Sequence, residues 1–484
     1  MAFAFESKRL AAAAIAVALT AVLVWFGTGL NPWWPLMWFA PIPVLLFASR
    51  NSWWATASVS SLAWLLGFLN LWHFLRGFIG LPFQVMVPIY LSLVLGFTLS
   101  VLLFRALVLR GRYWSALLAL PASWVGGEFL HNLLSPDGTG GSLSYTQLKF
   151  LPFLQLASIT GPWGMSFLLL LFPAAIAIGW HLRRSEPKQA LRVVGATFGI
   201  LAVVLIFGTV RLALPMQKQQ AAQVKVGLIA SDEPANVDVA HEGVNTERLL
   251  SEYANEAEKL AAQGAQVIVI PEKLGVVVDP ATTNADAIFQ SLSDKAGVTI
   301  VAGLVRVDPP VKYNEARVYT PHAALIRYDK HHMLPPFESN LKPGTTIAML
   351  PEPHRNWGVE ICKDMDFTPL SRKYGEAGAG LMLAPAWDFV QDRLWHGHIA
   401  IMRGVEDGFS IARAAKQGYL TVSDDRGRIV AEARSDSAPF ATLLTEVPAT
   451  HDNTVYLVLG DWFGWLSVIM LIRLLARSLL RPRA

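Results

Sequence analysis

The chain's only cysteine, Cys362, follows the short apolar run W-G-V-E-I and comes directly before Lys363 and Asp364. Two other reactive side chains, Glu272 and Lys330, also stand where strand-like runs end, after Q-V-I-V-I-P and A-A-L-I-R-Y-D. A thiol attacks a carbonyl after losing its proton, and a carboxylate can take that proton as a general base. An ammonium group and backbone N–H groups can stabilise the oxyanion that forms. The three residue types together predict acyl transfer through a thioester.

Each of these residues also has an ordinary explanation when it is taken alone. An acid that opens a loop and a lysine at a strand end are usually solvated, and a lone cysteine is commonly a small buried apolar residue. Their joint occurrence at three run ends favours the catalytic interpretation, in which cationic neighbours also favour the thiolate form of Cys362. The two histidines that follow Lys330, His331 and His332, could supply a base. We expect loop residues instead, because a carboxylate already fills that role.

The elements that must position these side chains lie between about residues 222 and 450, where strand-like runs alternate with helical patterns. Strands are predicted at 225–230, 266–272, 299–307, 323–330, 357–362 and 381–386, with 299–307 and 323–330 as neighbours, and three further strands end the domain. Helices are predicted near 243–263, 282–296, 368–377 and 393–413. This alternation predicts an α/β domain whose sheet is covered by helices. Ligands bind such sheets at the carboxyl ends of the strands, where the three reactive side chains stand.

Long apolar runs broken by short basic clusters make up the rest of the chain. Hydrophobic residues account for 53% of the sequence and charged residues for 16%, with 17 tryptophans and a mean hydropathy of +0.40. About 20 apolar residues cross a bilayer. We therefore predict a multi-span α-helical membrane domain of eight helices, at 10–27, 33–49, 53–73, 83–108, 113–131, 162–181, 191–213 and 455–475. The first run resembles a signal peptide but lacks a small-residue cleavage site, which predicts an uncleaved helix.

The basic residues predict the orientation of these helices. They gather in every second loop, at residues 8–9, 50, 105–112, 183–192 and 473–483, whereas the alternate loops carry few. By the positive-inside rule both termini are expected in the cytoplasm and the 222–450 domain outside it. The same bias accounts for the net charge of +4, which therefore gives no argument for nucleic-acid binding. One cysteine excludes an internal disulfide, and no Cys/His spacing suits a zinc site.

Three stretches, I-P-E, Y-D-K-H-H-M-L-P-P-F-E and G-V-E-I-C-K-D, resemble the Glu–Lys–Cys signature of the nitrilase superfamily. The stretch around the lysine, and a nitrilase-like domain placed before the last of eight spans, resemble the bacterial apolipoprotein N-acyltransferase family over nearly the whole chain. The resemblance implies transmembrane helices 1–7 at 1–221, an αββα sandwich domain at 222–450, and an eighth helix with a basic cytoplasmic tail at 451–484.

The resemblance also implies roles for individual residues. Glu272 would be the general base, Lys330 the oxyanion-stabilising lysine and Cys362 the nucleophile. Glu338, eight residues after the lysine, matches the family's second glutamate, which assists positioning. The stretch A-P-A-W-D-F falls where the family usually has an Asn-Asp-Ala-Trp-like segment, which implies that Trp387 forms a wall of the lipid cavity.

Four more residues are expected to affect the site. Leu334 and Phe337 belong to an apolar stretch, 333–337, that suits either a mobile loop against lipid or a packed core. The chain departs from the family pattern after the cysteine, where Lys363 replaces an aromatic residue and Asp364 a glutamate. Asp364 has the shorter reach of the two acids, and Lys363 changes the expected acyl-chain contacts.

The function that the resemblance implies is transfer of an acyl chain from a phospholipid, through a cysteine thioester, to the α-amino group of a lipoprotein's diacylglyceryl cysteine. A bacterial inner-membrane location, a monomeric state and the absence of a fixed cofactor or metal are expected. A membrane-bound amidase with the same triad and an acyltransferase for another amine stay open as alternatives. So does a non-enzymatic scaffold, against which the intact triad argues.

Overall fold

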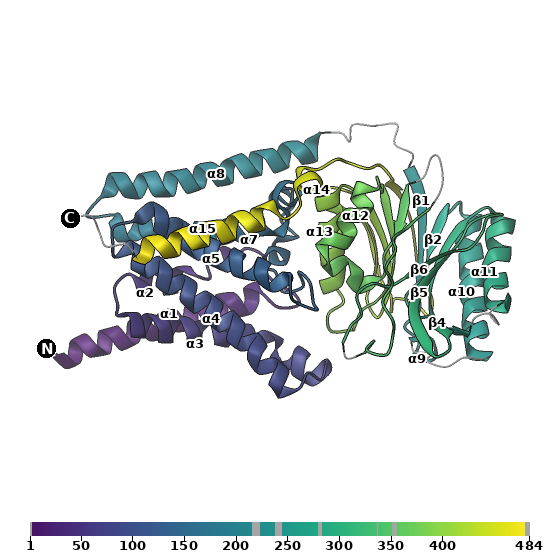
Figure 1. Ribbon diagram of the computed structural model, residues 1–484, viewed down its shortest axis with the longest axis horizontal. Helices are drawn as coiled ribbons and strands as arrows, with labels where there is room; N and C mark the ends of the chain where they lie inside the picture. The colour runs from purple at the N-terminus through teal and green to yellow at the C-terminus, as the bar shows by residue number, and fades with distance from the viewer. Residues whose placement is uncertain are drawn as a thin grey trace. The chain divides into compact units, whose positions relative to one another are not determined.

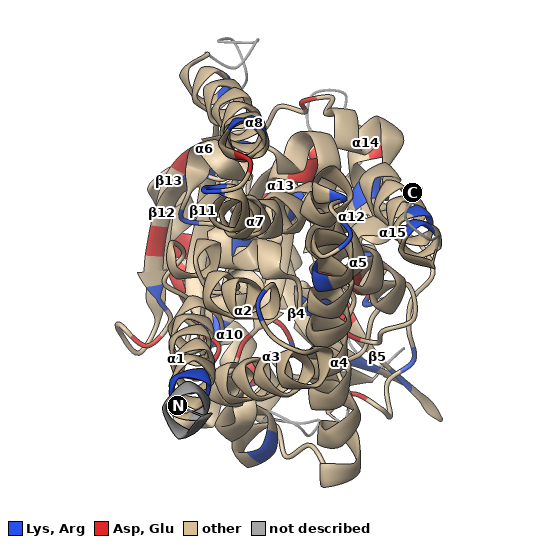
Figure 2. Cartoon of the chain, turned by 90° about the vertical axis from the view of Figure 1, so that its left-hand side faces the viewer, with Lys and Arg blue, Asp and Glu red and all other residues tan. Residues whose placement is uncertain are grey.

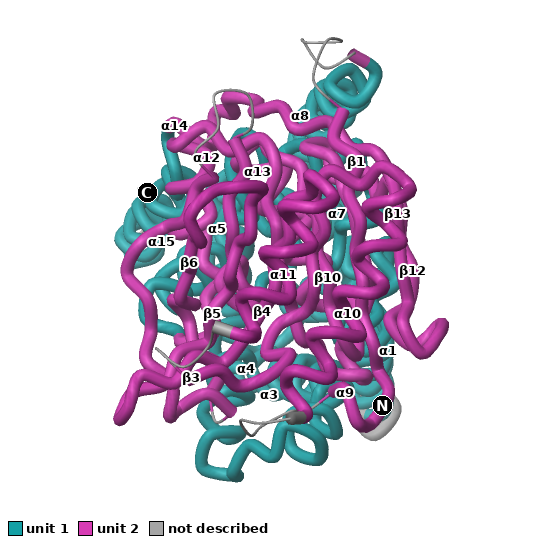
Figure 3. The backbone as a smooth tube through the Cα atoms, turned by 90° about the vertical axis from the view of Figure 1, so that its right-hand side faces the viewer, with its two compact units in different colours: residues 1–135, 141–213, 459–484 teal, residues 136–140, 214–458 magenta. Residues whose placement is uncertain are grey.

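The computed structural model spans residues 1–484 and describes residues 2–214, 223–237, 244–278, 283–335, 337–350 and 356–479. Pro336 of the apolar loop, and Arg481 and Arg483 of the basic tail, lie outside the described residues. Contacts divide the chain into two units (Figure 3). The membrane unit comprises residues 1–135, 141–213 and 459–484, and the α/β unit comprises residues 136–140 and 214–458.

Over the described residues, the membrane unit has six helices that are long and apolar enough to cross a membrane. They are α1 (Ala2–Gly27), α3 (Trp53–Phe68, extended by η2, Leu69–Leu71), α4 (Phe83–Val108), α7 (Ala157–Leu182), α8 (Pro187–Ala213) and α15 (Trp462–Leu479). Helix α8 leaves large apolar side chains such as Ile200, Val203 and Ile206 exposed. Outward-facing apolar side chains suit a helix surrounded by lipid. In Figure 2 these helices are mostly tan, because few of their residues are Lys, Arg, Asp or Glu.

The other two predicted spans take different forms. Residues 113–131 lie in a helix, α5 (Tyr113–Asn132), which is not one of the six. Residues 33–49 fold as two short pieces, η1 (Leu36–Trp38) and α2 (Ile42–Ala48), with Pro35 and Pro41 at their N-caps. Proline removes backbone donors and favours such breaks. The last span begins later than predicted, because α14 (Val455–Leu459) ends before Gly460, whose φ is +59°.

The remaining elements of the membrane unit are η3 (His73–Phe78), η4 (Leu143–Gln147) and α6 (Leu151–Leu154). The last two lie between α5 and α7 in the chain.

Two sheets form the centre of the α/β unit, as far as the described ranges extend. One has the strand order β13-β1-β2-β4-β5-β6 with β3 beside β4, and the other has the order β12-β11-β10-β9-β8-β7. The first sheet consists of β1 (Gln223–Ala230), β2 (Val267–Val269), β3 (Val276–Val278), β4 (Thr299–Asp308), β5 (Val311–Tyr319), β6 (Ile326–Asp329) and β13 (Ala441–Pro448). The second consists of β7 (Ala348–Met349), β8 (Trp357–Val359), β9 (Leu381–Trp387), β10 (Ser410–Lys416), β11 (Tyr419–Ser423) and β12 (Ile429–Arg434).

The two sheets pack face to face, and helices cover their outer faces. Side chains alternate along each strand, so Val301 of β4 joins a core shared with the second sheet while Ile300 and Ala302 join the outer core. That outer core also contains residues of α10 (Val244–Ala262) and α11 (Thr283–Ala296). In Figure 1, α12 (Thr368–Glu376) and α13 (Trp395–Asp407) lie on the opposite side of the strands. The α/β unit is therefore an αββα sandwich. It also contains the short helices α9 (Pro234–Val237) and η5 (Cys362–Asp366).

Two predictions about this domain are wrong in detail. Strands 299–307 and 323–330 are not neighbours, because β5 pairs antiparallel with both β4 and β6. The helix predicted near 393–413 ends at Asp407, where Gly408 takes a left-handed φ of +75°, and residues 410–416 form β10. Both differences add a strand that contributes a residue to the candidate site.

Candidate active site

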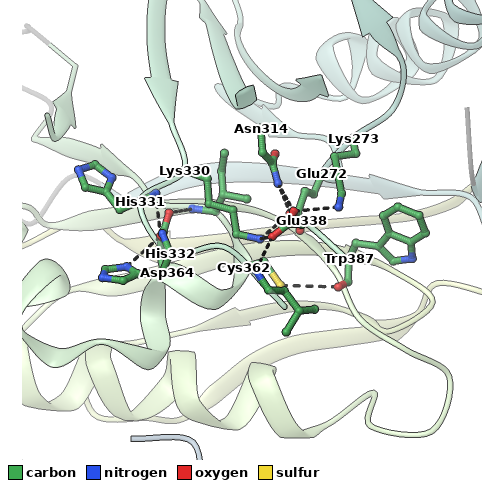
Figure 4. Close-up of polar contacts among 12 residues, drawn as sticks. Glu272, Lys273, Asn314, Lys330, His331, His332, Glu338, Cys362, Asp364 and Trp387 are labelled. Carbon is green, nitrogen blue, oxygen red and sulfur yellow. Dashed lines mark hydrogen bonds and ion pairs between the residues drawn. The ribbon is translucent and has the colours of Figure 1, made fainter. Parts of the chain in front are cut away.

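Three strand ends bring Glu272, Lys330 and Cys362 together (Figure 4). Glu272 follows β2, Lys330 follows β6 and Cys362 follows β8. Strand β2 runs parallel to β4, and the two antiparallel pairings of β5 give β6 the same direction. All three side chains are buried, and Lys330 Nζ lies 2.8 Å from Glu272 Oε1. The structure thus brings together the three residues that the sequence predicts for acyl transfer.

Glu338 holds the Lys330 ammonium from a second side. Its Oε2 accepts hydrogen bonds from Lys330 Nζ and from the backbone N–H of Leu334, both at 2.9 Å. Its Oε1 accepts from Lys273 Nζ at 2.8 Å and from Asn314 Nδ2 at 2.7 Å. Glu338 therefore fixes both the reactive lysine and the loop that follows it.

The charges of this array reinforce one another. Burial raises the pKa of Glu338, but Lys330 and Lys273 more than offset this and hold it below its usual range. Burial lowers the pKa of Lys330, but the Glu272 and Glu338 carboxylates raise it well above its ordinary value. Asn314 Nδ2 also donates to Glu272 Oε1 at 2.5 Å, so one amide joins the two carboxylates. The two carboxylates therefore favour the ammonium form of Lys330.

Cys362 takes an unusual backbone conformation at the start of η5. Its φ is +44°, in the left-handed region that residues other than glycine rarely occupy. Its Sγ lies 3.6 Å from the carbonyl oxygen of Trp387 and 3.9 Å from Nη2 of Arg413.

The protonation of the Cys362 thiol follows from its surroundings. Burial and the Glu272 charge raise the pKa of the thiol well above its ordinary value, whereas Lys330 and Arg413 lower it. The predicted effect of cationic neighbours is present, but burial outweighs it. The resting group is a neutral thiol, so it needs a base in order to attack.

Asp364 ties the lysine loop to the cysteine turn. Its Oδ1 accepts from the backbone N–H groups of His331 at 3.0 Å and His332 at 2.8 Å, and its Oδ2 accepts from the Tyr328 hydroxyl at 2.7 Å. The rings of His331 and His332 contact Tyr328 and Asp364 respectively, which suits the prediction that both are loop residues. Asp364 thus links two of the strand ends that carry reactive side chains.

The other expected supporting residues lie around the triad. Lys363 Nζ forms an ion pair with Asp137 Oδ1 at 2.7 Å. Two ammonium groups lie over the Trp387 ring, with Lys416 Nζ 3.8 Å and Lys273 Nζ 5.1 Å from its centroid. Trp387 also donates from Nε1 to Gln417 at 3.0 Å.

The two apolar residues predicted beside the lysine occupy the loop after β6. Leu334 is half-buried, and Phe337 is exposed with its ring centroid 5.3 Å from that of Phe389. An exposed Phe337 argues against a fully packed core at this end of the loop.

Sequence reasoning missed four residues of this site: Lys273, Asn314, Asp388 and Arg413. Arg413 is buried on β10 and donates from Nη1 to Asp388 Oδ2 at 2.7 Å. The available signals were a charged residue within the apolar run S-I-A-R-A-A and an asparagine within V-K-Y-N-E-A-R-V. In the described ranges, no group of three or more His, Cys, Asp or Glu side chains could hold a metal ion.

The site offers a base, a cation and a nucleophile in one buried place. Glu272 can accept a proton, Lys330 can stabilise a developing negative charge, and the Cys362 sulfur can form a covalent bond with an acyl group. Such an arrangement suits transfer of an acyl group between an ester or amide and a second nucleophile.

Two protein families match this chain by sequence. Residues 20–175 match the family described as apolipoprotein N-acyltransferase N-terminal domain. Residues 220–443 match the family described as carbon-nitrogen hydrolase.

Several relatives match this chain across both domains. An apolipoprotein N-acyltransferase of Geobacter metallireducens is 28% identical over 474 residues, covering 90% of this chain and 89% of the relative. Proteins of the same name from Pasteurella multocida and Gloeobacter violaceus are 25% and 24% identical, and cover 91% and 90% of this chain and 91% and 88% of their own lengths.

Solved structures match part of the chain. An amidase from Nesterenkonia sp. is 19% identical with a TM-score of 0.40, covering 48% of this chain and 91% of that one. A nitrilase-superfamily protein of Saccharomyces cerevisiae is 19% identical with a TM-score of 0.41, covering 51% of this chain and 97% of that one.

Proposed function

We propose that this chain, which matches the apolipoprotein N-acyltransferase N-terminal domain over residues 20–175 and carbon-nitrogen hydrolases over residues 220–443, moves an acyl chain from a phospholipid to the α-amino group of a lipoprotein's diacylglyceryl cysteine. The observation that carries the proposal is the buried Glu272–Lys330–Glu338 array beside the single thiol of Cys362. The proposal specifies the donor, the acceptor and the covalent route of a membrane-embedded, lipoprotein-processing N-acyltransferase.

In the first half-reaction, the donor ester is converted to a thioester. Cys362 transfers its proton to Glu272 while Sγ forms a bond with the carbonyl carbon of the phospholipid ester. The Lys330 ammonium stabilises the negative charge on the carbonyl oxygen of the tetrahedral intermediate. The ester C–O bond then breaks, the departing oxygen takes the proton from Glu272, and a lysophospholipid leaves.

In the second half-reaction, the acceptor amine attacks the thioester carbonyl. A C–N bond forms and the C–S bond breaks, while Glu272 takes a proton from the amine and returns it to the Cys362 sulfur. The neutral thiol is regenerated and the product is an amide. One base serves both steps, which suits a buried thiol whose pKa is raised by burial.

The apolar residues near the triad support a lipid donor. Phe337 is 47% exposed and packs on Phe389, on the loop that follows Lys330. An exposed phenylalanine beside a buried reactive site gains free energy when a hydrocarbon chain covers it. We assign the acyl chain to the surface formed by Leu334, Phe337 and Trp387.

The location proposed for the reaction follows from the same substrates. Both lipids would lie in the outer leaflet of a bacterial inner membrane, with the α/β unit outside the cytoplasm and both termini inside it. The enzyme is proposed to act as a monomer and without a bound cofactor.

Intact-protein mass spectrometry tests the proposal. The purified protein is incubated in detergent with phosphatidylethanolamine, and a Cys362→Ala variant serves as the control. The expected result is an added acyl mass on the wild type that hydroxylamine removes and that the variant never shows. Adding a diacylglyceryl-cysteine peptide should then discharge the adduct and yield an N-acylated peptide.

Two other outcomes would redirect the assignment. Discharge of the thioester by a different amine, with the lipopeptide inert, would overturn the acceptor while keeping the acyl-enzyme. No adduct with any phospholipid, together with ammonia release from a small amide, would identify a membrane-bound amidase instead.

A further inference from the structure

The backbone of Cys362 has to be held by its neighbours. A non-glycine residue in the left-handed region is strained, and such a conformation persists only where the surrounding structure enforces it. Cys362 has a φ of +44° and opens η5, whose last residue is Asp366. Whatever fixes η5 therefore also fixes the direction of the sulfur.

A five-residue loop far away in the sequence contacts this turn. The loop, Pro136–Gly140, follows α5 after three intervening residues but belongs with the α/β unit. Thr139 donates to the carbonyl oxygen of Asp366 twice, from its backbone N–H at 2.9 Å and from Oγ1 at 2.8 Å. The loop thus caps the far end of η5.

Gly138 lets the loop approach this closely. Its φ is +52°, and a Cβ built on it would lie 2.4 Å from the carbonyl oxygen of Asp366. Any other residue would be strained at this φ and would push the loop away from the turn.

An ion pair makes the third contact, at the residue next to the nucleophile. Lys363 Nζ lies 2.7 Å from Asp137 Oδ1, although the two residues are 226 positions apart. The two side chains differ in burial, because Lys363 is 4% exposed and Asp137 is 64% exposed. Loss of the ion pair therefore costs more free energy at Lys363 than at Asp137, because a buried ammonium without its anion is poorly solvated.

We propose that the loop Pro136–Gly140 is a clamp on the nucleophile turn, in which Asp137 and Thr139 are positioning residues that act through Lys363 and Asp366. The inference rests on the proposed role of Cys362 as the nucleophile. The clamp keeps the strained turn in the one conformation that aims the sulfur at the donor carbonyl. It also gives Lys363, which replaces the expected aromatic residue, a defined position.

A double-mutant cycle tests the ion pair. Asp137→Asn removes the anion and leaves a buried ammonium, whereas Lys363→Met removes the cation and leaves an exposed acid. Asp137→Asn should slow single-turnover thioester formation at saturating phosphatidylethanolamine about tenfold or more, because small displacements of a reactive group have large effects on rate. The donor concentration at half-saturation should stay unchanged. In the Lys363→Met background, Asp137→Asn should have no further effect.

Alkylation of Cys362 by iodoacetamide supplies a second readout that needs no lipid. This readout separates the clamp from the proposed function. If the wild type forms no thioester, but Asp137→Asn slows alkylation only when Lys363 is present, the clamp is supported and the phospholipid donor is not. Glu258→Gln, which breaks an exposed ion pair with Lys295, is the matched control and should keep the wild-type rates.

Two results would overturn the clamp. One is an unchanged alkylation and acylation rate in Asp137→Asn. The other is that Asp137→Asn slows the reactions by the same factor, within about twofold, in the wild-type and Lys363→Met backgrounds, as expected for independent sites. If Asp137→Asn does not fold, Thr139→Val and Thr139→Ser decide instead. The clamp then requires slower reactions in the valine variant and near-normal rates in the serine variant, which keeps the hydroxyl donor.

Discussion

Replacing Glu338 by Gln removes one buried negative charge and nearly preserves the shape of the side chain. The variant leaves Lys330 with Glu272 as its remaining close carboxylate, and it leaves Lys273 without its anion. Lys330 then loses one of the two carboxylates that hold its ammonium in position beside Cys362. We therefore expect Glu338→Gln to slow thioester formation as well as to destabilise the fold.

The size of the effect follows from the burial of the pair. Glu338 is 1% exposed and Lys330 is 2% exposed, so their interaction is little screened by solvent. Removing one partner of a buried ion pair costs about 3–5 kcal/mol. If about 3 kcal/mol of this is lost in the transition state, thioester formation becomes about a hundredfold slower, at roughly 1.4 kcal/mol for each factor of ten.

The assay compares Glu338→Gln with a matched variant on the same sheet. Glu315 is a fully buried carboxylate of β5 that pairs with Arg306 and Arg317, so Glu315→Gln removes a similar charge outside the site. The Tm of thermal unfolding should fall in both variants. The single-turnover rate of thioester formation, measured by intact mass well below either Tm, should fall only in Glu338→Gln. If both variants lose stability equally and both keep the wild-type rate, Glu338 serves folding alone and the reasoning is refuted.

Three further expectations concern the surrounding charges. Asp364→Asn should slow thioester formation about tenfold, because hydrogen bonds to a charged group contribute about 1.5–3 kcal/mol each; an unchanged single-turnover rate would contradict the role of Asp364 as a link between strand ends. Arg413→Met should raise the pKa of Cys362 further and slow its alkylation by iodoacetamide at pH 8, whereas Arg413→Lys keeps a cation and should react faster than the methionine variant; equal rates in the two would exclude an effect of charge. Burial raises the pKa of Asp392 to about 6, so folding favours its protonated form; this contribution is complete below about pH 4 and is lost as the pH rises through about 6. Asp392→Asn should therefore raise the Tm relative to wild type above pH 6 and change it little at pH 4, and a Tm difference independent of pH would refute the assignment.

Local sequence patterns determined the class of the two parts of this protein. In a membrane, the backbone N–H and C=O groups of a long apolar run find hydrogen-bond partners within the run when it forms a helix. Alternating strand and helix patterns indicate a sheet that is covered by helices. The positions of Glu272, Lys330 and Cys362 were also readable, because each stands at or close after the end of a strand-like run. These features depend only on residues that are close together in the chain, so they can be recognised from the sequence alone.

Tertiary structure alone decided which side chains complete the site. Asn314 reaches the two carboxylates because β5 lies between β4 and β6, and Arg413 reaches the thiol because residues 410–416 form a strand parallel to β9. The ion pair of Lys363 with Asp137 joins residues 226 positions apart. No local periodicity encodes such partners, because strand order and loop packing are set by the burial of whole surfaces and by the pairing of buried charges. The sequence therefore specified the reactive groups, and the fold specified the charges that hold them in place.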